Sequence, residues 1–267
     1  MPELPDVEGF KRVLARRALR KTIDRVVVSD ARILDKLPAR ALAARLKGAK
    51  LVSARRHGKH LMAKIDRGGW LTLHFGLTGA LHFVRSADRE PPFTRVRLDF
   101  AGGGCLAYTN KRMLGRVGLV EDAADFIAEE ELGPDALDRR FDFRAFQAAV
   151  HGSKRGVKSV LMDQQIIAGV GNIYSDEILF QARINPATRI DKLATREQKR
   201  LFAQMRKVLK TAVARGAGSE QFVDRLPKGA MLPERKPGGR CPRCRSPLKV
   251  FKVAGRTGYC CPRCQNC

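Results

Sequence analysis

The first residues of the chain, Met1-Pro2-Glu3-Leu4-Pro5, combine groups that can support covalent chemistry. Methionine before a small residue such as proline is normally removed, which would leave Pro2 with a free secondary amine. An α-amino group has a pKa of about 7.7–8.0, against about 10.4 for a lysine side chain, so more of it is unprotonated near neutral pH. Such an amine can attack an electrophilic sugar carbon to form an iminium, and the adjacent Glu3 carboxyl can transfer protons. The alternative is an ordinary helix start, with Pro5 at the first helical position.

Two copies of Cys-Pro-Arg-Cys, at residues 241–244 and 261–264, are separated by 16 residues. Each copy can place two thiolates on one metal, and two such knuckles joined by a hairpin complete a tetrahedral site. The predicted ligands of one structural Zn²⁺ are Cys241, Cys244, Cys261 and Cys264. Free buried thiols are the alternative. Cys260 and Cys267 complicate the choice of ligands, because Cys264 and Cys267 also have the CxxC spacing.

Residues 158–163 and Gly169-Val-Gly-Asn172 are typical of a helix, a tight glycine turn and a second helix. Backbone N–H groups at the start of a helix bind phosphate, and the Asn172 amide adds a donor. Lys154 and Lys158 would add positive charge. The segment therefore predicts a phosphate site, with a plain helical packing unit as the alternative.

Glycine-flanked turns carry four further candidates. Lys59 lies in Gly58-Lys59-His60, between two predicted strands, where a lysine is usually just solvated. Leu77, Arg112 and Leu114 lie in two other turns. Apolar and basic tips of this kind can wedge into a base stack, although hairpin turns with one stray hydrophobic residue are the commoner explanation.

The charge balance indicates the kind of partner. The 267 residues include 52 Lys and Arg against 27 Asp and Glu, a formal net charge of +25. This excess favours a polyanion, most simply nucleic acid, over a basic surface kept for solubility. No apolar run would span a bilayer and no signal-peptide pattern is present, so we expect no membrane partner and a cytoplasmic protein, nucleoid-associated if bacterial.

The elements that must position these residues follow from hydrophobic periodicity. Residues 5–19 predict a helix, and several short strands after it favour a two-sheet sandwich. The predicted strands cover 22–28, 51–54, 60–65, 70–75, 81–84, 95–100 and 106–108, with a short helix at 39–46. Residues 143–214 have a helical pattern, and residues 216–240, rich in Gly, Pro, Lys and Arg, predict a mobile loop.

Together these motifs make the chain resemble the formamidopyrimidine-DNA glycosylase / endonuclease VIII family of base-excision repair enzymes. The resemblance runs from end to end. It is carried by Pro2-Glu3-Leu4-Pro5, Gly58-Lys59, His74–Gly79, Tyr108–Gly115, Leu132-Gly133-Pro134, Leu161–Asp163, Gly169–Tyr174 and the knuckles with Arg256. The Leu-Pro after Glu3 and the His-x-Gly-x-Thr-Gly stretch favour the formamidopyrimidine branch.

The resemblance implies an α+β multidomain fold. It places a catalytic helix and two-sheet β-sandwich at 1–120, a helix-two-turn-helix α domain at 135–226, and a loop with a C-terminal β-hairpin zinc finger at 227–267. The acidic stretch 121–132 and Gly133-Pro134 themselves predict a linker at 121–134.

The resemblance also implies roles for particular residues. Pro2 would be the Schiff-base nucleophile, Glu3 an acid/base, and Lys59 a catalytic lysine. Arg256 would contact a phosphate linked to the later elimination. Other residues would hold DNA: Lys154, Lys158 and Asn172 on phosphates, and Leu77, Arg112 and Leu114 in the gap left by the extruded base.

The implied activity is that of a bifunctional DNA glycosylase and abasic-site lyase acting as a monomer on damaged double-stranded DNA. It would excise oxidised purines such as 8-oxoguanine and formamidopyrimidines. One alternative is an endonuclease VIII-like preference for oxidised pyrimidines, and another is a non-catalytic DNA-damage-binding protein. The chain departs from the family pattern at Asp6 (usually Glu), Leu77 (usually Met), Lys111 (usually Pro) and Leu114 (usually Phe).

Overall fold

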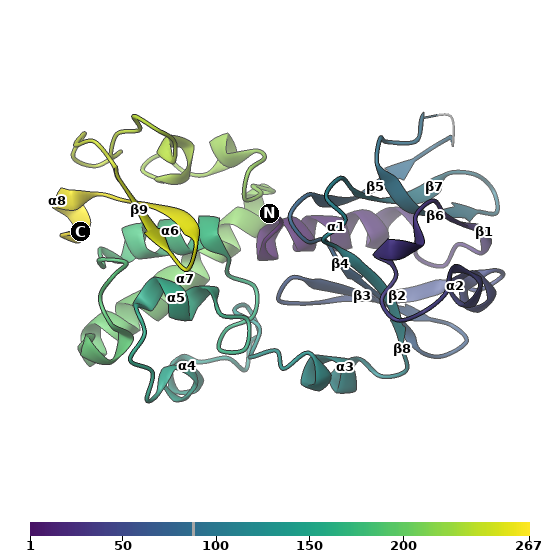
Figure 1. Ribbon diagram of the computed structural model, residues 1–267, viewed down its shortest axis with the longest axis horizontal. Helices are drawn as coiled ribbons and strands as arrows, with labels where there is room; N and C mark the ends of the chain where they lie inside the picture. Colours follow the sequence, from purple (N-terminus) through teal and green to yellow (C-terminus); the bar gives the residue numbers. More distant parts are fainter. Residues whose placement is uncertain (87–88) are drawn as a thin grey trace. The chain divides into compact units, whose positions relative to one another are not determined.

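A computed structural model describes residues 1–86 and 89–267. The chain forms two compact units: Met1–Pro2 with Val7–Glu130, and Glu3–Asp6 with Glu131–Cys267. The N-terminal helix α1 (Leu4–Arg17) confirms the predicted helix (Figure 1). Its first turn belongs to the second unit and the rest to the first, so the chain start is part of both units.

The first unit is the predicted β-sandwich, built from two antiparallel sheets that have four strands each in the described residues (Figure 1). One sheet has the order β1 (Ile23–Val28), β6 (Thr94–Phe100), β7 (Cys105–Asn110) and β5 (Gly79–Val84). The other has the order β2 (Leu51–His57), β3 (His60–Ile65), β4 (Trp70–His74) and β8 (Arg116–Val120). Alternate strand residues and the apolar side of α1 form one core, with α2 (Ala39–Leu46) packed beside it. Strand β8 was not predicted.

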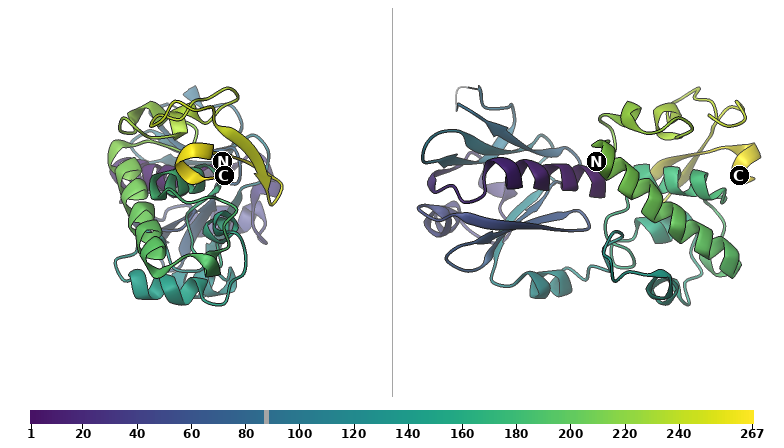
Figure 2. Two further views of the ribbon diagram at one scale, coloured as in Figure 1. Left: turned by 90° about the vertical axis from the view of Figure 1, so that its left-hand side faces the viewer. Right: turned by 180° about the vertical axis from the view of Figure 1, so that it is seen from behind.

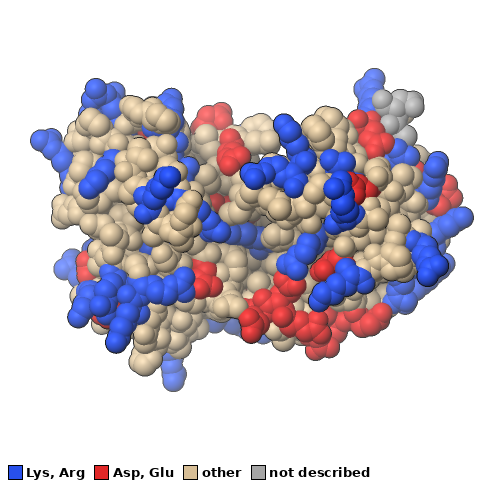
Figure 3. Space-filling view, in the orientation of Figure 1, with Lys and Arg blue, Asp and Glu red and all other residues tan. Residues whose placement is uncertain are grey.

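The segment predicted as an acidic linker contains a helix, α3 (Ala123–Glu129). Asp122 caps it by accepting from the backbone N–H groups of Ala124 and Asp125. Ala123 and Phe126, one turn apart, are buried in a cluster that includes Met62 and Trp70 of the sandwich. Acidic side chains gather over this segment in Figure 3. The apolar pair is the signal that distinguishes this helix from a solvated linker.

The second unit is helical, as the periodicity of residues 143–214 predicts. Its main helices are α4 (Phe143–Val150), α5 (Val157–Met162), α6 (Asn172–Ala182) and α7 (Thr195–Arg215). Their buried faces form a second core. Helix α6 packs against α7 and also against the C-terminal hairpin (Figures 1 and 2).

The segment predicted as a mobile loop, 216–240, is partly anchored. It contains two short 3₁₀ turns, η4 (Val223–Arg225) and η5 (Leu232–Glu234). Leu226, Met231 and Leu232 are buried. The Glu177 carboxylate on α6 accepts from the backbone N–H groups of Met231, at 2.7 Å, and Leu232, at 2.9 Å.

The chain ends in the predicted hairpin, β9 (Lys249–Val253) and β10 (Arg256–Cys260), followed by α8 (Pro262–Gln265). A small third core joins the base of this finger to α6 through Phe180, Met231 and Tyr259. These observations confirm the predicted α+β class with its sandwich, helical part and finger.

Candidate functional site

The carboxylate of Glu3 is fixed by the start of helix α6. Its side chain is completely buried. It accepts hydrogen bonds from the backbone N–H groups of Gly171 (2.8 Å), Ile173 (2.7 Å) and Tyr174 (3.1 Å). The first N–H groups of a helix have no partner within the helix and lie at the positive end of its dipole. They therefore stabilise a negative charge immediately after Pro2.

The glycines of the turn before α6 are needed for this approach. A Cβ atom on Gly171 would lie 2.5 Å from Oε1 of Glu3, and a Cβ on Gly169 would lie 2.6 Å from Cδ1 of Leu4. Gly169 also has a φ of +116°, which side chains disfavour. The N–H of Leu4 donates to the Gly169 carbonyl at 3.1 Å. The glycine turn is thus a cradle for residues 3 and 4.

This geometry corrects the prediction of a phosphate site at the start of α6. The backbone N–H groups expected to bind phosphate are occupied by the Glu3 carboxylate. The Asn172 amide donates through Nδ2 to the Thr257 carbonyl at 2.9 Å, which ties the start of α6 to the tip of the β9–β10 hairpin. Sequence alone did not distinguish a carboxylate from a phosphate, because the same donors suit either anion.

Lys158, predicted to contact a phosphate, lies inside the second unit. Its side chain has no exposed surface, and Nζ donates to Asp176 Oδ1 (2.5 Å), Ser175 Oγ (2.8 Å) and the Asn172 carbonyl (2.9 Å). Burial lowers the pKa of Lys158, and the Asp176 charge opposes that shift. An ammonium with three internal partners is not placed to reach a phosphate. Lys154, in contrast, is exposed.

Arg256 begins strand β10 at the tip of the hairpin and is exposed. It pairs with Val253 across the hairpin, and its Nη1 lies 3.8 Å from the Met162 sulfur. Its guanidinium lies at the surface, and the predicted phosphate contact stays a prediction.

Lys59 lies in the β2–β3 turn of the first unit and is only 9% exposed. The adjacent His60 is a feature that sequence reasoning missed. Its ring centre lies 4.8 Å from that of His74, with the two planes tilted by 34°, and neither ring nitrogen of His60 has a hydrogen-bond partner among the described residues. Burial lowers the pKa of His60 well below its usual value, and burial with the nearby Arg116 lowers the pKa of His74 to about 4. The pair is therefore neutral at neutral pH.

The two turns predicted to carry wedge residues lie together in the first unit. The backbone N–H of Arg112 donates to Thr78 Oγ1 at 3.1 Å, and the Leu114 N–H donates to Asn110 Oδ1 at 3.3 Å. Arg112 is exposed, Leu114 is 50% exposed, and Leu77 is half-buried. The structure thus brings Leu77, Arg112 and Leu114 onto one pair of linked turns.

The four predicted ligand cysteines form a cluster. The sulfur atoms of Cys241, Cys244, Cys261 and Cys264 all lie within 4.8 Å of one another. The Cys264 N–H also points at the Cys261 sulfur, at 3.3 Å. Four converging thiols suit the tetrahedral coordination of a structural metal site.

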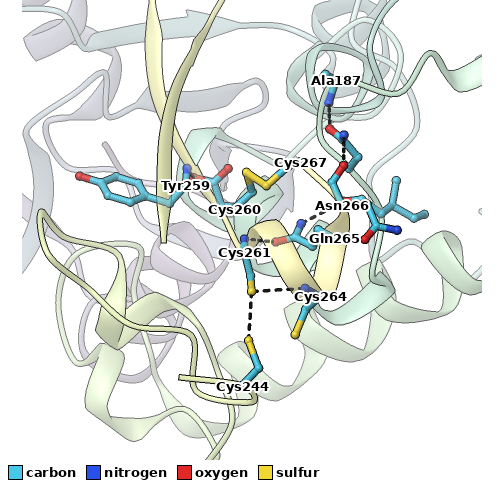
Figure 4. Close-up of a disulfide and its surroundings, with 12 residues drawn as sticks. Ala187, Cys244, Tyr259, Cys260, Cys261, Cys264, Gln265, Asn266 and Cys267 are labelled. Atoms are coloured by element: carbon cyan, nitrogen blue, oxygen red, sulfur yellow. Dashed lines mark hydrogen bonds between the residues drawn. A yellow bond between two sulfur atoms is a disulfide. The ribbon is translucent and has the colours of Figure 1, made fainter. Parts of the chain in front are cut away.

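The remaining two finger cysteines form a disulfide, Cys260–Cys267 (Figure 4). This pairing resolves the ligand ambiguity, because Cys267 is bonded and does not join the cluster. It was not expected, since the CxxC spacing made Cys267 a competing candidate for the metal. Beside it, Gln265 bridges the Cys261 N–H and the Ile184 carbonyl, each at 2.9 Å, so this knuckle is fastened to the end of α6.

Comparison with known proteins defines the class first. Residues 1–117 match the family model of the formamidopyrimidine-DNA glycosylase N-terminal domain, and residues 132–224 match that of its H2TH domain. The fold is thus that of a helix-two-turn-helix DNA glycosylase. Formamidopyrimidine-DNA glycosylases of Heliobacterium modesticaldum and Geobacter metallireducens are 34% and 35% identical over the whole of both chains. This chain belongs to the formamidopyrimidine-DNA glycosylase family.

Solved structures agree with that assignment. The Lactococcus lactis formamidopyrimidine-DNA glycosylase bound to DNA with an abasic site has a TM-score of 0.88 and 26% identity, covering 98% of this chain and 99% of that one. A mutant of the same enzyme with Fapy-dG DNA has a TM-score of 0.89 and 27% identity, covering 99% of each chain. Among the described residues of this chain, no helix has the length and apolar character to cross a membrane.

Proposed function

We propose that this protein is a DNA glycosylase and abasic-site lyase that removes oxidised purines from duplex DNA through a Schiff base on Pro2. The observation that carries the proposal is the buried Glu3 carboxylate, held by three N–H groups of α6 directly after Pro2. Membership of the family supports the class of reaction.

The chemistry begins with extrusion of the damaged nucleotide, because its C1′ cannot be reached inside the base stack. The lone pair of the Pro2 nitrogen forms a bond to C1′ while the bond from C1′ to the base breaks, and the base leaves with the bonding electron pair and takes a proton from solvent. Opening of the sugar ring gives a C1′ iminium. That iminium makes the C2′ proton acidic, and its removal eliminates the 3′ phosphate and cuts the strand.

Glu3 suits proton transfer in these steps. Oε2 accepts from the Gly171 and Tyr174 N–H groups and Oε1 from the Ile173 N–H group, so we propose Oε1 as the oxygen that transfers the proton. It can therefore accept the proton of the Pro2 ammonium and return it to the opening sugar. The backbone donors fix the position of the carboxylate, which reduces the ordering needed during reaction.

We propose that the exposed cations Lys154 and Arg256 bind phosphates. Lys59, which is largely buried, would act at the reacting nucleotide, and the linked turns with Leu77, Arg112 and Leu114 would fill the gap left by the base. The net charge of +25 supports a polyanionic partner. We expect a monomer that acts inside the cell, where the DNA is.

The four-cysteine cluster would hold one structural Zn²⁺. Four protein ligands close the coordination sphere, so the ion would stabilise the finger and take no part in the reaction. The β9–β10 hairpin, which carries Arg256, lies between the two knuckles, so we expect a bound ion to stabilise it as well.

We infer the class of damaged base from the names of the relatives. The Heliobacterium modesticaldum and Geobacter metallireducens proteins are named formamidopyrimidine-DNA glycosylases, and one Lactococcus lactis complex contains Fapy-dG DNA. These names favour oxidised purines over the oxidised pyrimidines of the endonuclease VIII branch. Intact Pro2 and Glu3 argue against a protein that only binds damage.

Borohydride trapping on matched duplexes tests the proposal. Borohydride reduces the iminium to a stable amine, so a covalent adduct should form on an 8-oxoguanine duplex and more weakly on a thymine glycol duplex. A protein with an N-terminal extension, in which Pro2 is an internal amide, should bind DNA but give no adduct. Trapping by the extended protein would assign the nucleophile elsewhere, and stronger trapping on thymine glycol would assign the pyrimidine class.

A further inference from the structure

Asp176 on helix α6 is a completely buried carboxylate for which the proposed chemistry has no use. Its Oδ1 accepts from Lys158 Nζ at 2.5 Å, and its Oδ2 accepts from Arg235 Nε at 2.8 Å. Oδ2 also accepts from the backbone N–H of Tyr259 at 3.1 Å. One side chain therefore binds helix α5, the segment before the finger, and strand β10 to α6.

These contacts converge on the tip of the hairpin. Arg235 donates through Nη2 to the Thr257 carbonyl at 2.8 Å, while its guanidinium lies 5.0 Å from the centre of the Tyr259 ring. The same carbonyl accepts from Asn172 Nδ2 at 2.9 Å. Thr257 directly follows Arg256, so two donors organised by α6 hold the backbone next to the guanidinium proposed to bind a phosphate.

The charges explain why the arrangement depends on Asp176. Its carboxylate is shared by two cations, and the Lys158 and Arg235 side chains are 0% and 13% exposed. Removing the negative charge leaves both cations facing each other with little solvent, which is strongly unfavourable. Arg235 is the less buried of the two and is the one with a route to water, so it would leave and release the Thr257 carbonyl.

The base of the finger has attachments of its own. Arg243 donates to the Phe180 carbonyl at 2.8 Å, and Gln265 donates to the Ile184 carbonyl at 2.9 Å. The cysteine cluster adds the metal site. Loss of the Asp176 charge should therefore loosen the tip of the hairpin, where Thr257 keeps Asn172 but loses Arg235, while the base stays in place.

We infer that Asp176, acting through Arg235, is a positioning residue that sets the Arg256 end of the hairpin for the DNA phosphate. This inference rests on the proposed function and adds to it the element that orients the phosphate contact. Asp176 touches neither DNA nor the reacting sugar in this scheme; its effect passes through Thr257 to Arg256.

Glu177 provides a matched control. It is the next residue on the same helix and is 2% exposed. In the described part of the chain, its hydrogen-bond donors are the N–H groups of Met231 and Leu232 and the amide of Gln181, none of which lies in the hairpin. Glu177→Gln removes the charge but keeps an acceptor oxygen for the Met231 and Leu232 N–H groups, so the η5 turn directly before Arg235 stays anchored.

A double-mutant cycle tests the inference. Single-turnover excision, strand elimination and affinity for a duplex with a tetrahydrofuran abasic analogue would be measured for Asp176→Asn, Arg256→Ala and the combination. We expect Asp176→Asn to weaken affinity and slow elimination about tenfold, with zinc content unchanged, and to add little to Arg256→Ala. Arg235→Gln, which keeps the Lys158–Asp176 pair, should reproduce the effect if Asp176→Asn folds poorly. Glu177→Gln should combine additively with Arg256→Ala.

Two outcomes would overturn the inference while the proposed function stands. One is an additive loss when Asp176→Asn, or its substitute Arg235→Gln, is combined with Arg256→Ala. The other is equal coupling of Glu177→Gln to Arg256→Ala. Absence of excision and trapping by the wild-type protein would instead reject the proposed function, so the two failures are distinguishable.

Discussion

At the scale of single residues, the chemistry depends on how closely backbone and side chain approach. Glu3 is held by charge-assisted bonds, each worth about 1.5–3 kcal/mol. The bonds form only because Gly171 has no side chain. Gly171, which has no reactive group, therefore decides where the Glu3 carboxylate lies.

Gly171→Ala should displace Glu3, since the new Cβ would lie 2.5 Å from its Oε1. A misplacement of about 1 Å costs on the order of 100-fold in rate, so single-turnover excision should fall by roughly that factor. The control is Gly9→Ala in α1, where the described residues leave the space around a new Cβ open to 4 Å. Equal activity of the two variants would mean that the Glu3 position is not needed for excision.

At the scale of elements, short turns and knuckles present the functional groups, and contacts with neighbouring segments fix their positions. The linked turns of the first unit present Leu77, Arg112 and Leu114, and the C-terminal knuckles present a cluster of thiols. In both cases hydrogen bonds between neighbouring segments set the geometry, as between Arg112 and Thr78. Each element can thus be tested by one substitution that spares its backbone.

Arg112→Ala should slow excision from duplex DNA far more than from single-stranded DNA. An extruded base leaves a gap only in a duplex, and the long Arg112 side chain can bond to the orphaned partner base. Single-turnover rates on both substrates provide the measurement, with Lys111→Ala, exposed in the same turn, as the control. Equal losses on both substrates would make Arg112 a backbone contact or a structural residue.

Cys244→Ser should release the metal and weaken DNA binding, with little change in the thermal unfolding of the β-sandwich. We expect about one Zn per wild-type chain by elemental analysis, in keeping with a four-ligand site. Cys267→Ser is the control, because it breaks the disulfide and leaves the cluster intact. Zinc retained by Cys244→Ser, or lost equally from Cys267→Ser, would contradict the assigned ligands.

At the scale of the whole molecule, a net charge of +25 makes binding to DNA strongly dependent on salt. Charge alone does not say which cations take part. The structure separates exposed cations such as Lys154 from internal ones such as Lys158, whose charge is already shared with Asp176. Only exposed cations such as Lys154 can bind a DNA phosphate and so release the counterion that the phosphate held.

Lys154→Ala should therefore lower the slope of log affinity against log salt by about one. Lys158→Met should leave that slope unchanged and instead lower the free energy of unfolding, because it removes one partner of a buried ion pair. Binding titrations at several salt concentrations and thermal unfolding of both variants supply the measurement. The reverse pattern would show that Lys158 leaves its internal site to bind DNA.

The sequence by itself determined the features that depend on neighbouring residues. Two CxxC knuckles predict four converging sulfurs, because each knuckle is a local chelate. The 3.6-residue and two-residue periodicities predict α1 and most of the strands, because each pattern describes one buried face. The family resemblance came from the same local motifs.

Only the tertiary structure decided which partners these motifs acquire. The N–H groups at the start of α6 suit any anion. Packing places the carboxylate of Glu3, which is far away in the sequence, on these N–H groups, so they are not left for a phosphate. Lys158 is internal because Asp176 faces it, and Cys267 is excluded from the cluster because Cys260 lies within bonding reach. A donor, a cation or a thiol has the same chemistry wherever it lies. Its partner is set by contacts between segments remote along the chain, and no local pattern encodes them.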